Sequence, residues 1–323
     1  MWLIWSLVSI LLFAFCEVFE KKGSDIREPF SETKMLVWFG IFGLLTAAAV
    51  AAFGLRETDL SLLEIVPAYP SMALGIVFYF LSLLLSFVAM KFIPVSVSVP
   101  ITNTNGILAF VGAVLLYSLR GKYQEIAEEV TLPKVILVLV ISAAVVVFSV
   151  IYQRQIMGGR DESFLGRLHR DGQRKKVMLF ALIGIVCAAL SAACDAGNSV
   201  VTYYILDGVI ASNDYLFFSN LLFAFLGAAA WVFVSVREKR PYNPFGKHQA
   251  AKAIGAGLDC VGMVTYVLAV DENPFFSDPI IATYFIFTVF LSHLILREKL
   301  SKRQIFCIVV LALCICAFAF LDL

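Results

Sequence analysis

The chain alternates between long apolar runs and short polar segments. Ten apolar runs cover approximately residues 1 to 20, 35 to 55, 70 to 91, 94 to 118, 132 to 152, 177 to 205, 214 to 236, 250 to 270, 275 to 296 and 303 to 321. A helix needs about 20 residues to cross the hydrocarbon core of a bilayer, so each run can supply one crossing. No run alternates polar and apolar residues as the strand of a membrane barrel does. The pattern predicts an all-α membrane protein with ten transmembrane helices.

The composition supports this prediction. Of the 323 residues, 61% are hydrophobic and 15% are charged, and the mean hydropathy is +0.90. About half of the residues of a soluble domain are apolar, so this chain is far more apolar than such a domain. The first run lacks a basic leading segment and a small-residue cleavage site, which favours a membrane helix over a signal peptide.

Several other function classes find no support. The seven cysteines all lie in predicted helices without a spacing framework for disulfides or zinc. A formal net charge of +1 offers no basic surface for nucleic acid. The chain contains no P-loop, H-E-x-x-H or G-x-S-x-G motif. We therefore expect that the protein is not an enzyme and uses no cofactor, metal or nucleic-acid partner.

The two halves of the sequence resemble each other. The segment FVAMKFIPVSVSVPI at 87 to 101 aligns with YVLAVDENPFFSDPI, 179 positions later, and FCE at 15 to 17 resembles ACD at 193 to 195. These matches pair Pro100 with Pro279, and Glu17 with Asp195. The further matches, in the same order, are TAAAV with GAAAW (46 to 50 and 227 to 231) and LRGK with LREK (119 to 122 and 296 to 299).

These matches predict two five-helix repeats, 1 to 152 and 177 to 323, joined by a basic linker from 153 to 176. Because five is an odd number, the second repeat must enter the membrane upside down. Inverted repeats are typical of transporters that work by alternating access.

Two motifs resemble the drug/metabolite transporter superfamily, in its EamA-like branch. The segment AMKFIPVS, with Ala89, Lys91, Pro94 and Ser96, fits the family pattern A-L-K-x-x-P-A-S at the end of helix 3. The family's G-E-x-L-x-x-x-Q turn before the last helix is matched by Glu298, Leu300 and Gln304, with Arg297 in place of the glycine. The resemblance covers essentially the whole chain and implies a ten-helix secondary transporter.

Basic residues predict the orientation in the membrane. Of the 25 lysines and arginines, 21 lie in or beside the loops that follow odd-numbered helices. The positive-inside rule therefore predicts that these loops, including 153 to 176, are cytoplasmic and that both termini are outside. We expect a multi-pass protein of the plasma membrane, in contact with lipid, whose oligomeric state the sequence leaves open.

Acidic residues inside apolar helices are functional candidates, because a charge at membrane depth is costly unless it is paired or wet. Asp195 belongs to a polar stripe on one helical face with Ser191, Asn198 and Thr202. We expect this stripe to face protein or water, and Gly197 allows a backbone to approach or the helix to unwind. The stripe either binds substrate or only links helices.

Asp259 is the acid nearest mid-membrane, roughly 12 Å deep at about 1.5 Å per residue. It shares a helical face with Gly255, Gly262 and Tyr266, so we expect open space beside it. Its repeat mate is Phe80, which suggests a role in substrate choice. The alternative is a protonated aspartate bonded to a neighbouring helix.

Glu17 lies one turn before Lys21, with which it can form an ion pair. As the repeat mate of Asp195 it is also a candidate, together with Asp195, for gating or proton coupling. We expect the two acids to line opposite entrances.

Amide and aromatic side chains complete the candidate substrate site. Asn103, Asn105 and Asn220 either bind a polar solute or link helices. We expect Pro100 and Pro279 to kink their helices. The tyrosines that could hold an ammonium group by cation–π attraction are Tyr79, Tyr203, Tyr204, Tyr266 and Tyr284.

These candidates favour a small-molecule substrate that is cationic or zwitterionic, such as an amine, a quaternary ammonium compound or an amino acid. Lys91 and Lys252 lie near helix ends, where they can extend to the interface. Acids inside the helices without evident basic partners disfavour organic phosphates. Protons are the candidate coupling ion. The alternatives are a transporter of a neutral sugar or nucleoside and a membrane scaffold that transports nothing.

Overall fold

The computed structural model describes residues 1–25, 28–53, 69–121, 131–157, 174–204, 210–246, 249–272, 281, 283–298 and 300–321. Over these residues the chain is all-helical and contains no strand. The predicted all-α class is confirmed.

Eight of the ten predicted apolar runs match a helix to within about five residues, whereas the fourth run is divided between two helices and the ninth is described as a helix only from Tyr284. In chain order they are α1 (Trp2–Gly23), α2 (Ser31–Ala52), α3 (Tyr69–Phe92), α4 (Val95–Thr102), α5 (Asn105–Leu119), α7 (Leu132–Met157), α9 (Arg174–Tyr204), α10 (Ser212–Glu238), α11 (Ala250–Glu272), α13 (Tyr284–Leu291), the π-helical turn η3 (Ser292–Leu296) and α14 (Lys302–Leu321). The predicted linker is partly helical, because α7 continues to Met157 and α9 already begins at Arg174. Residues 158–173 of the linker lie outside the described residues.

Six helices of the described chain are long and apolar enough to cross a bilayer. They are Trp2–Gly23, Ser31–Ala52, Tyr69–Phe92, Lys175–Thr202, Asn213–Glu238 and Ala250–Ala269. On α1 the exposed Leu3, Leu7 and Leu11 recur every four residues, so one face of the helix is apolar and uncovered. These features are compatible with a membrane-embedded protein.

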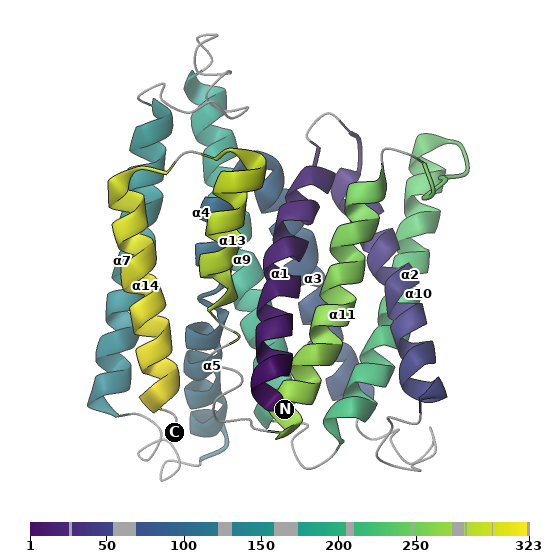
Figure 1. Ribbon diagram of the computed structural model, residues 1–323, viewed down its shortest axis with the longest axis horizontal. Helices are drawn as coiled ribbons and strands as arrows, with labels where there is room; N and C mark the ends of the chain where they lie inside the picture. Colours follow the sequence, from purple (N-terminus) through teal and green to yellow (C-terminus); the bar gives the residue numbers. More distant parts are fainter. Residues whose placement is uncertain are drawn as a thin grey trace.

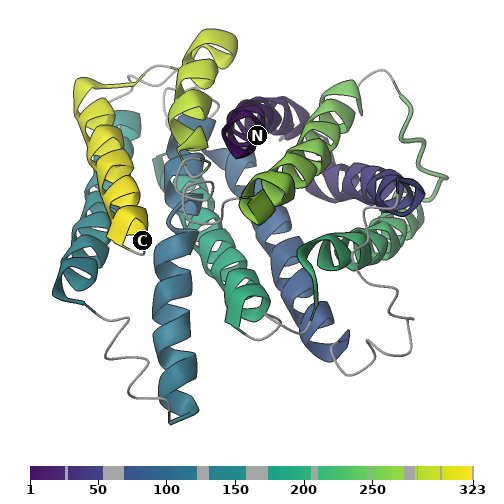
Figure 2. The ribbon, with the colours of Figure 1, turned by 60° about the horizontal axis from the view of Figure 1, so that its bottom comes forward.

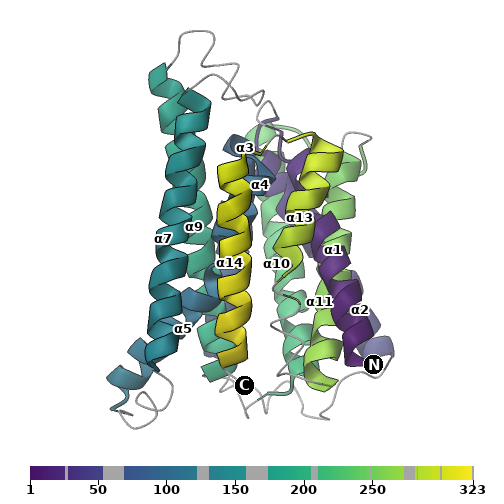
Figure 3. The ribbon, with the colours of Figure 1, turned by 60° about the vertical axis from the view of Figure 1, so that its left-hand side comes forward.

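The helices run along one common direction (Figures 1 and 3). In the orientation of Figure 1, α1 begins at the lower face of the molecule and α9 begins at the upper face. Both termini lie at the lower face, and α1, α3, α7 and α10 end at the upper face. The first helices of the two halves of the chain therefore point in opposite directions.

Helices from different halves of the chain pack as pairs. The main pairs are α1 with α11, α3 with α9, α2 with α10 and α7 with α14. Seen toward the lower face, the α2–α10 pair and the α7–α14 pair lie on opposite sides of the molecule (Figure 2). In the α2–α10 pair a Cβ atom on Gly40 would lie 2.6 Å from the Cα of Gly227, so the two backbones touch there.

Other glycines also serve close packing. A Cβ atom on Gly255 would lie 3.0 Å from Cγ of Glu20, and one on Gly262 would lie 2.8 Å from the ring of Phe13. The predicted open space beside Asp259 is therefore wrong on this face of α11, because α1 fills it. Gly197, which allows either close approach or unwinding, lies in a continuous part of α9, and the Phe78 ring packs against it.

The predicted fourth crossing is interrupted. Helix α4 ends at Thr102, and α5 begins at Asn105. Pro100 lies inside α4, and the helix ends two residues later. In the second half, helix α13 begins at Tyr284, 179 positions after Asn105. Pro279, the counterpart of Pro100, lies outside the described residues.

Candidate functional site

A cluster of four carboxyl side chains occupies the interior of the helix bundle. We call it the central acidic cluster, and its members are Glu17 and Glu20 of α1, Asp195 of α9 and Asp259 of α11. Glu17 and Asp259 interact electrostatically, as do Glu20 and Asp259, and Asp259 and Asp195. The four acids therefore share one electrostatic environment although they come from three helices.

Asp259 is only 9% exposed and faces α1 and α3. Its Oδ1 lies 4.0 Å from Sγ of Cys16, and it interacts electrostatically with Tyr79 of α3. The same cysteine donates to Oε1 of Glu20 over 3.2 Å. Cys16 thus links the acids of α1 to the acid of α11.

Glu17 meets α13. Its Oε1 accepts a hydrogen bond from the Tyr284 hydroxyl at 3.4 Å, and its Oε2 is buried without a hydrogen-bond partner among the described residues. Tyr284 also interacts with Asn103, at the break between α4 and α5. A carboxylate oxygen buried without a donor is costly, which marks this position as one that a cation or a proton could occupy.

Asp195 meets the first residue of α5. Its Oδ2 accepts a hydrogen bond from Nδ2 of Asn105. Since Asn105 follows the helix break directly, the break brings its side chain to the acid of α9. The backbone amides of Asn103 and Thr104 donate to the carbonyls of Val99 and Ile101, respectively, at the break.

Not every predicted residue joins the cluster. Asn198 accepts a hydrogen bond from the Tyr215 hydroxyl at 3.1 Å, so it faces α10. Asn220 donates to the carbonyl of Leu216 on its own helix at 2.8 Å. Tyr266 packs in an apolar group that includes Ile10. The side chains of Tyr203 and Tyr204 lie outside the described residues.

Glu20 is a member of the cluster that the sequence prediction missed. The predicted first run ends at residue 20, which implies an interfacial glutamate, whereas α1 continues to Gly23 and buries it. The available signal was the spacing of three residues from Glu17, which puts both acids on one face of a helix.

Nζ of Lys21, the nearest lysine along α1, donates to the carbonyl of Ile93 at 2.8 Å. No group of three His, Cys, Asp or Glu side chains in the described ranges could hold a metal ion. Several buried carboxyl groups that share one site need protons or a cation to offset their mutual repulsion.

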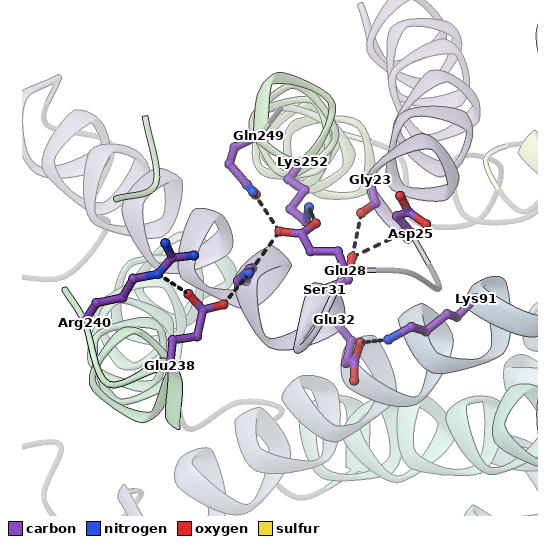
Figure 4. A network of polar contacts seen from close by, with 11 residues as sticks. Gly23, Asp25, Glu28, Ser31, Glu32, Lys91, Glu238, Arg240, Gln249 and Lys252 are labelled. Carbon is purple, nitrogen blue, oxygen red and sulfur yellow. Dashed lines mark hydrogen bonds and ion pairs between the residues drawn. The ribbon is translucent and has the colours of Figure 1, made fainter. Parts of the chain in front are cut away.

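The upper face carries a second, different set of charges (Figure 4). Glu28 accepts hydrogen bonds from Lys252 at 2.5 Å, Gln249 at 2.8 Å and Lys34 at 3.1 Å. Lys34 also pairs with Glu238 at 2.6 Å. We call these five residues the upper-face network.

The basic residues of this network balance its acids. Lys252 is 1% exposed and pairs with Glu28 at 2.5 Å, and Lys91 pairs with Glu32 at 2.7 Å, so both lysines reach carboxylates near helix ends. Burial alone raises the pKa of Glu28, but the hydrogen bonds from Lys252, Gln249 and Lys34 outweigh burial and lower this pKa.

Comparisons with known proteins identify the fold alone. No protein-family model matches the chain, and no curated protein matches it in sequence. Seven solved chains are similar in structure. One of them, a protein crystal structure, aligns with 99% of this chain and 96% of its own chain, with a TM-score of 0.57 and 15% identity. At that identity the similarity shows a shared fold.

Proposed function

We propose that the protein is a secondary transporter of the drug/metabolite transporter superfamily, EamA-like branch. It moves a small cationic or zwitterionic metabolite by alternating access, with protons as the coupling ion. One observation carries the proposal: Asn105 bonds Asp195 while Tyr284 bonds Glu17. Asn105 and Tyr284 are repeat mates in the sequence, and so are Glu17 and Asp195. The two contacts are therefore the same contact made twice, each time between a helix break of one half and an acid of the other.

Three further observations support two inverted five-helix repeats. The helix starts at Asn105 and Tyr284 are 179 positions apart, the offset at which the sequence halves match. The opening helices α1 and α9 run in opposite directions (Figure 1). Exchanging the halves converts the α1–α11 pair into α9–α3 and the α5–α9 pair into α13–α1, and all four pairs are in contact.

Charge supports the choice of substrate. The central acidic cluster can attract a positive group, because four carboxyl groups share one electrostatic environment there. Tyr79 and Tyr284 border the cluster and can stack on an ammonium group. A buried carboxyl group that is protonated in one state and ionised in the other can exchange a proton for the cation.

Orientation is part of the proposal. The upper face carries the turn after α1 and the helix ends at Lys91 and Arg237, whereas both termini lie at the lower face (Figure 1). With the positive-inside rule, the upper face is cytoplasmic in the plasma membrane. An impermeant thiol reagent applied to intact cells should then fail to label a cysteine introduced between residues 158 and 173.

Asp259 is the residue whose charge we expect to recognise the positive end of the substrate. The test uses Asp259→Asn, which keeps the volume of the side chain and deletes its charge. Thermal shift with choline, ethanolamine and amino acids measures binding, and uptake of the same compounds into proteoliposomes measures transport. Affinity should fall by about 1.5 to 3 kcal/mol, the range for hydrogen bonds to charged groups.

The matched control is Asp25→Asn, an exposed aspartate after α1, which should bind as the wild type does. Normal binding and uptake by Asp259→Asn would remove Asp259 from the site and leave Asp195 as the next candidate. Wild-type protein that accumulates none of the cationic or zwitterionic probes would refute the proposed substrate class, and accumulation of sugars or nucleosides would replace it.

A further inference from the structure

The junction between α3 and α4 exposes two helix ends at one point. Helix α3 ends at Phe92, and α4 begins at Val95 after Pro94. The first amides of a helix and its last carbonyls have no partner inside that helix. The amides of Val97 and Ser98 find an acceptor in the carbonyl of Pro94, at 3.0 and 2.9 Å. The amides of Val95 and Ser96 need an acceptor from elsewhere.

Glu298 supplies that acceptor from the other half of the chain. Its Oε1 accepts from the Val95 amide at 3.0 Å, and its Oε2 accepts from the Ser96 amide at 2.9 Å. Both carboxylate oxygens are therefore used, one on each amide. A carboxylate at this position also interacts favourably with the positive end of the dipole of α4.

Lys21 supplies the matching positive charge at the end of α3. Its Nζ donates to the carbonyls of Met90 and Ile93. The cation lies at the negative end of one helix, and the anion lies at the positive end of the next. Together they hold the α3–α4 junction between α1 and the turn before α14.

The turn that carries Glu298 is itself held in place. The Glu298 amide donates to the Ser292 carbonyl at 3.3 Å, and its carbonyl accepts from Nδ1 of His293 at 2.8 Å. Arg297, directly before it, has a left-handed backbone with φ of 57°. The π-helical turn and this residue together direct the Glu298 side chain toward α4.

Helix α4 is connected to the central acidic cluster through the residues that follow it. The helix has only eight residues, and its lower end passes into the break at Asn103 and Asn105. Because Asn105 bonds Asp195, a displacement of α4 displaces a contact of the cluster. A cap on the upper end of α4 thus acts on the cluster through one short rigid element.

The sequence match gives this cap no equivalent in the first half. Residues 119 to 122, LRGK, align with LREK at 296 to 299, so Gly121 occupies the position of Glu298. Glycine has no side chain to cap a helix. At the matched position the carboxylate is therefore present in the second half and absent from the first.

We propose that Glu298 is a positioning residue that locks the upper face closed by capping α4, and that it must leave α4 before this face can open. The proposal rests on the alternating-access function proposed above. The lock makes the two faces unequal: the energy barrier to opening is higher at the upper face than at the lower face, although the repeats alone would make the two barriers similar.

Cys16 provides a native reporter of opening. It lies in the cluster, is 3% exposed and is therefore protected in this arrangement. In full-length protein with the other six cysteines replaced by alanine, a cationic, membrane-impermeant methanethiosulfonate reagent is applied from either side of sealed vesicles. Glu298→Gln should raise the labelling rate of Cys16 from the upper face by about 2- to 30-fold, the range expected from losing a helix cap.

Sidedness separates a lock from a general loss of stability. Glu298→Ala removes both acceptor oxygens and should exceed Glu298→Gln, with labelling from the lower face unchanged for both. The control Glu272→Gln, which removes a carboxylate paired with the N-terminus at 3.1 Å on the lower face, should not raise upper-face labelling. Unchanged labelling, or an equal increase from both sides, would overturn the lock.

Choline binding to the same variants distinguishes the two proposals. Glu298→Gln leaves the carboxyl groups of the cluster intact, so a thermal shift with choline should persist in it if it occurs in the wild type. Sided labelling without a response to choline or the other cationic and zwitterionic probes in the wild type would refute the proposed substrate class and support the lock. Normal binding and transport with no change in labelling would refute the lock and support the transporter.

Discussion

Replacing Glu28 with glutamine leaves Lys252 with a buried ammonium group and no carboxylate in contact among the residues that the structure describes. The distance from Lys252 Nζ to Glu28 Oε2 is 2.5 Å, and the lysine is 1% exposed. The other lysine bound by Glu28 is less affected, because Lys34 keeps Glu238 at 2.6 Å. The main effect of the substitution is therefore one uncompensated charge inside the protein.

The structure sets the size of this effect. Removing one partner of a buried ion pair costs about 3 to 5 kcal/mol, because the remaining charge loses its compensation. Removing the lysine instead should cost less. In Lys252→Met the carboxylate of Glu28 keeps Lys34 at 3.1 Å and Gln249 at 2.8 Å, so we expect a loss of about 1 to 2 kcal/mol.

Thermal unfolding in detergent measures both variants and their combination. Glu28→Gln should lower the apparent Tm by roughly 6 to 10 °C, at about 2 °C for each kcal/mol. The double variant Glu28→Gln/Lys252→Met should be more stable than Glu28→Gln alone, since it contains no orphan charge. Equal stability of Glu28→Gln and wild type, or a double variant less stable than either single one, would refute the assignment of Glu28 as the counter-charge of a buried lysine.

Three other predictions follow from backbone geometry and charge. Because the folded pKa of Glu28 is lowered, its contribution to stability is complete above the unfolded pKa of about 4.3 and is lost as the pH falls through the lower folded pKa. In this pH range the unfolding free energy of the wild type should fall more steeply with decreasing pH than that of Glu28→Gln. Arg297→Gly should raise the unfolding free energy by about 0.5 to 1 kcal/mol by relieving a left-handed backbone, whereas Arg297→Ala should not. Gly227→Ala should destabilise by about 1 to 3 kcal/mol, since its Cβ would lie 2.5 Å from the Cα of Gly40, and Gly246→Ala, with nothing nearer than 3.9 Å, should be neutral in the same assay.

Hydropathy predicted the helices well because burial in lipid imposes a length and a composition on each segment. It did not predict that α4 and α5 are separate. An apolar run remains apolar whether the backbone is continuous or interrupted, and Asn103 and Thr104 are compatible with either. Gly197 shows the converse case: glycine permits unwinding, but the Phe78 ring packs against it and the helix continues.

Residue type and helical face identify three members of the central acidic cluster, Glu17, Asp195 and Asp259. What the sequence could not provide is which faces meet. Asn198 and Asn220 are polar residues of the type expected in a site. However, Asn198 faces Tyr215, and Asn220 bonds the carbonyl of Leu216 on its own helix. The upper-face network was beyond reach for the same reason: Glu28 and Lys252 are 224 positions apart, and no local pattern pairs them.

The two halves share a geometry but differ in the chemistry at matched positions. At the helix breaks one half places the amide of Asn105 and the other the phenol of Tyr284, and each reaches an acid of the opposite half. Asp259 has no such counterpart: its mate Phe80 lies 6.1 Å from the ring of Phe223 in an apolar cluster. On the proposed mechanism, the paired contacts are needed on both faces in turn and so persist in both halves. A residue that selects the substrate is needed only once. A substitution at the single carboxylate of Asp259 can therefore change the substrate specificity of the protein without disturbing the paired contacts that open and close it.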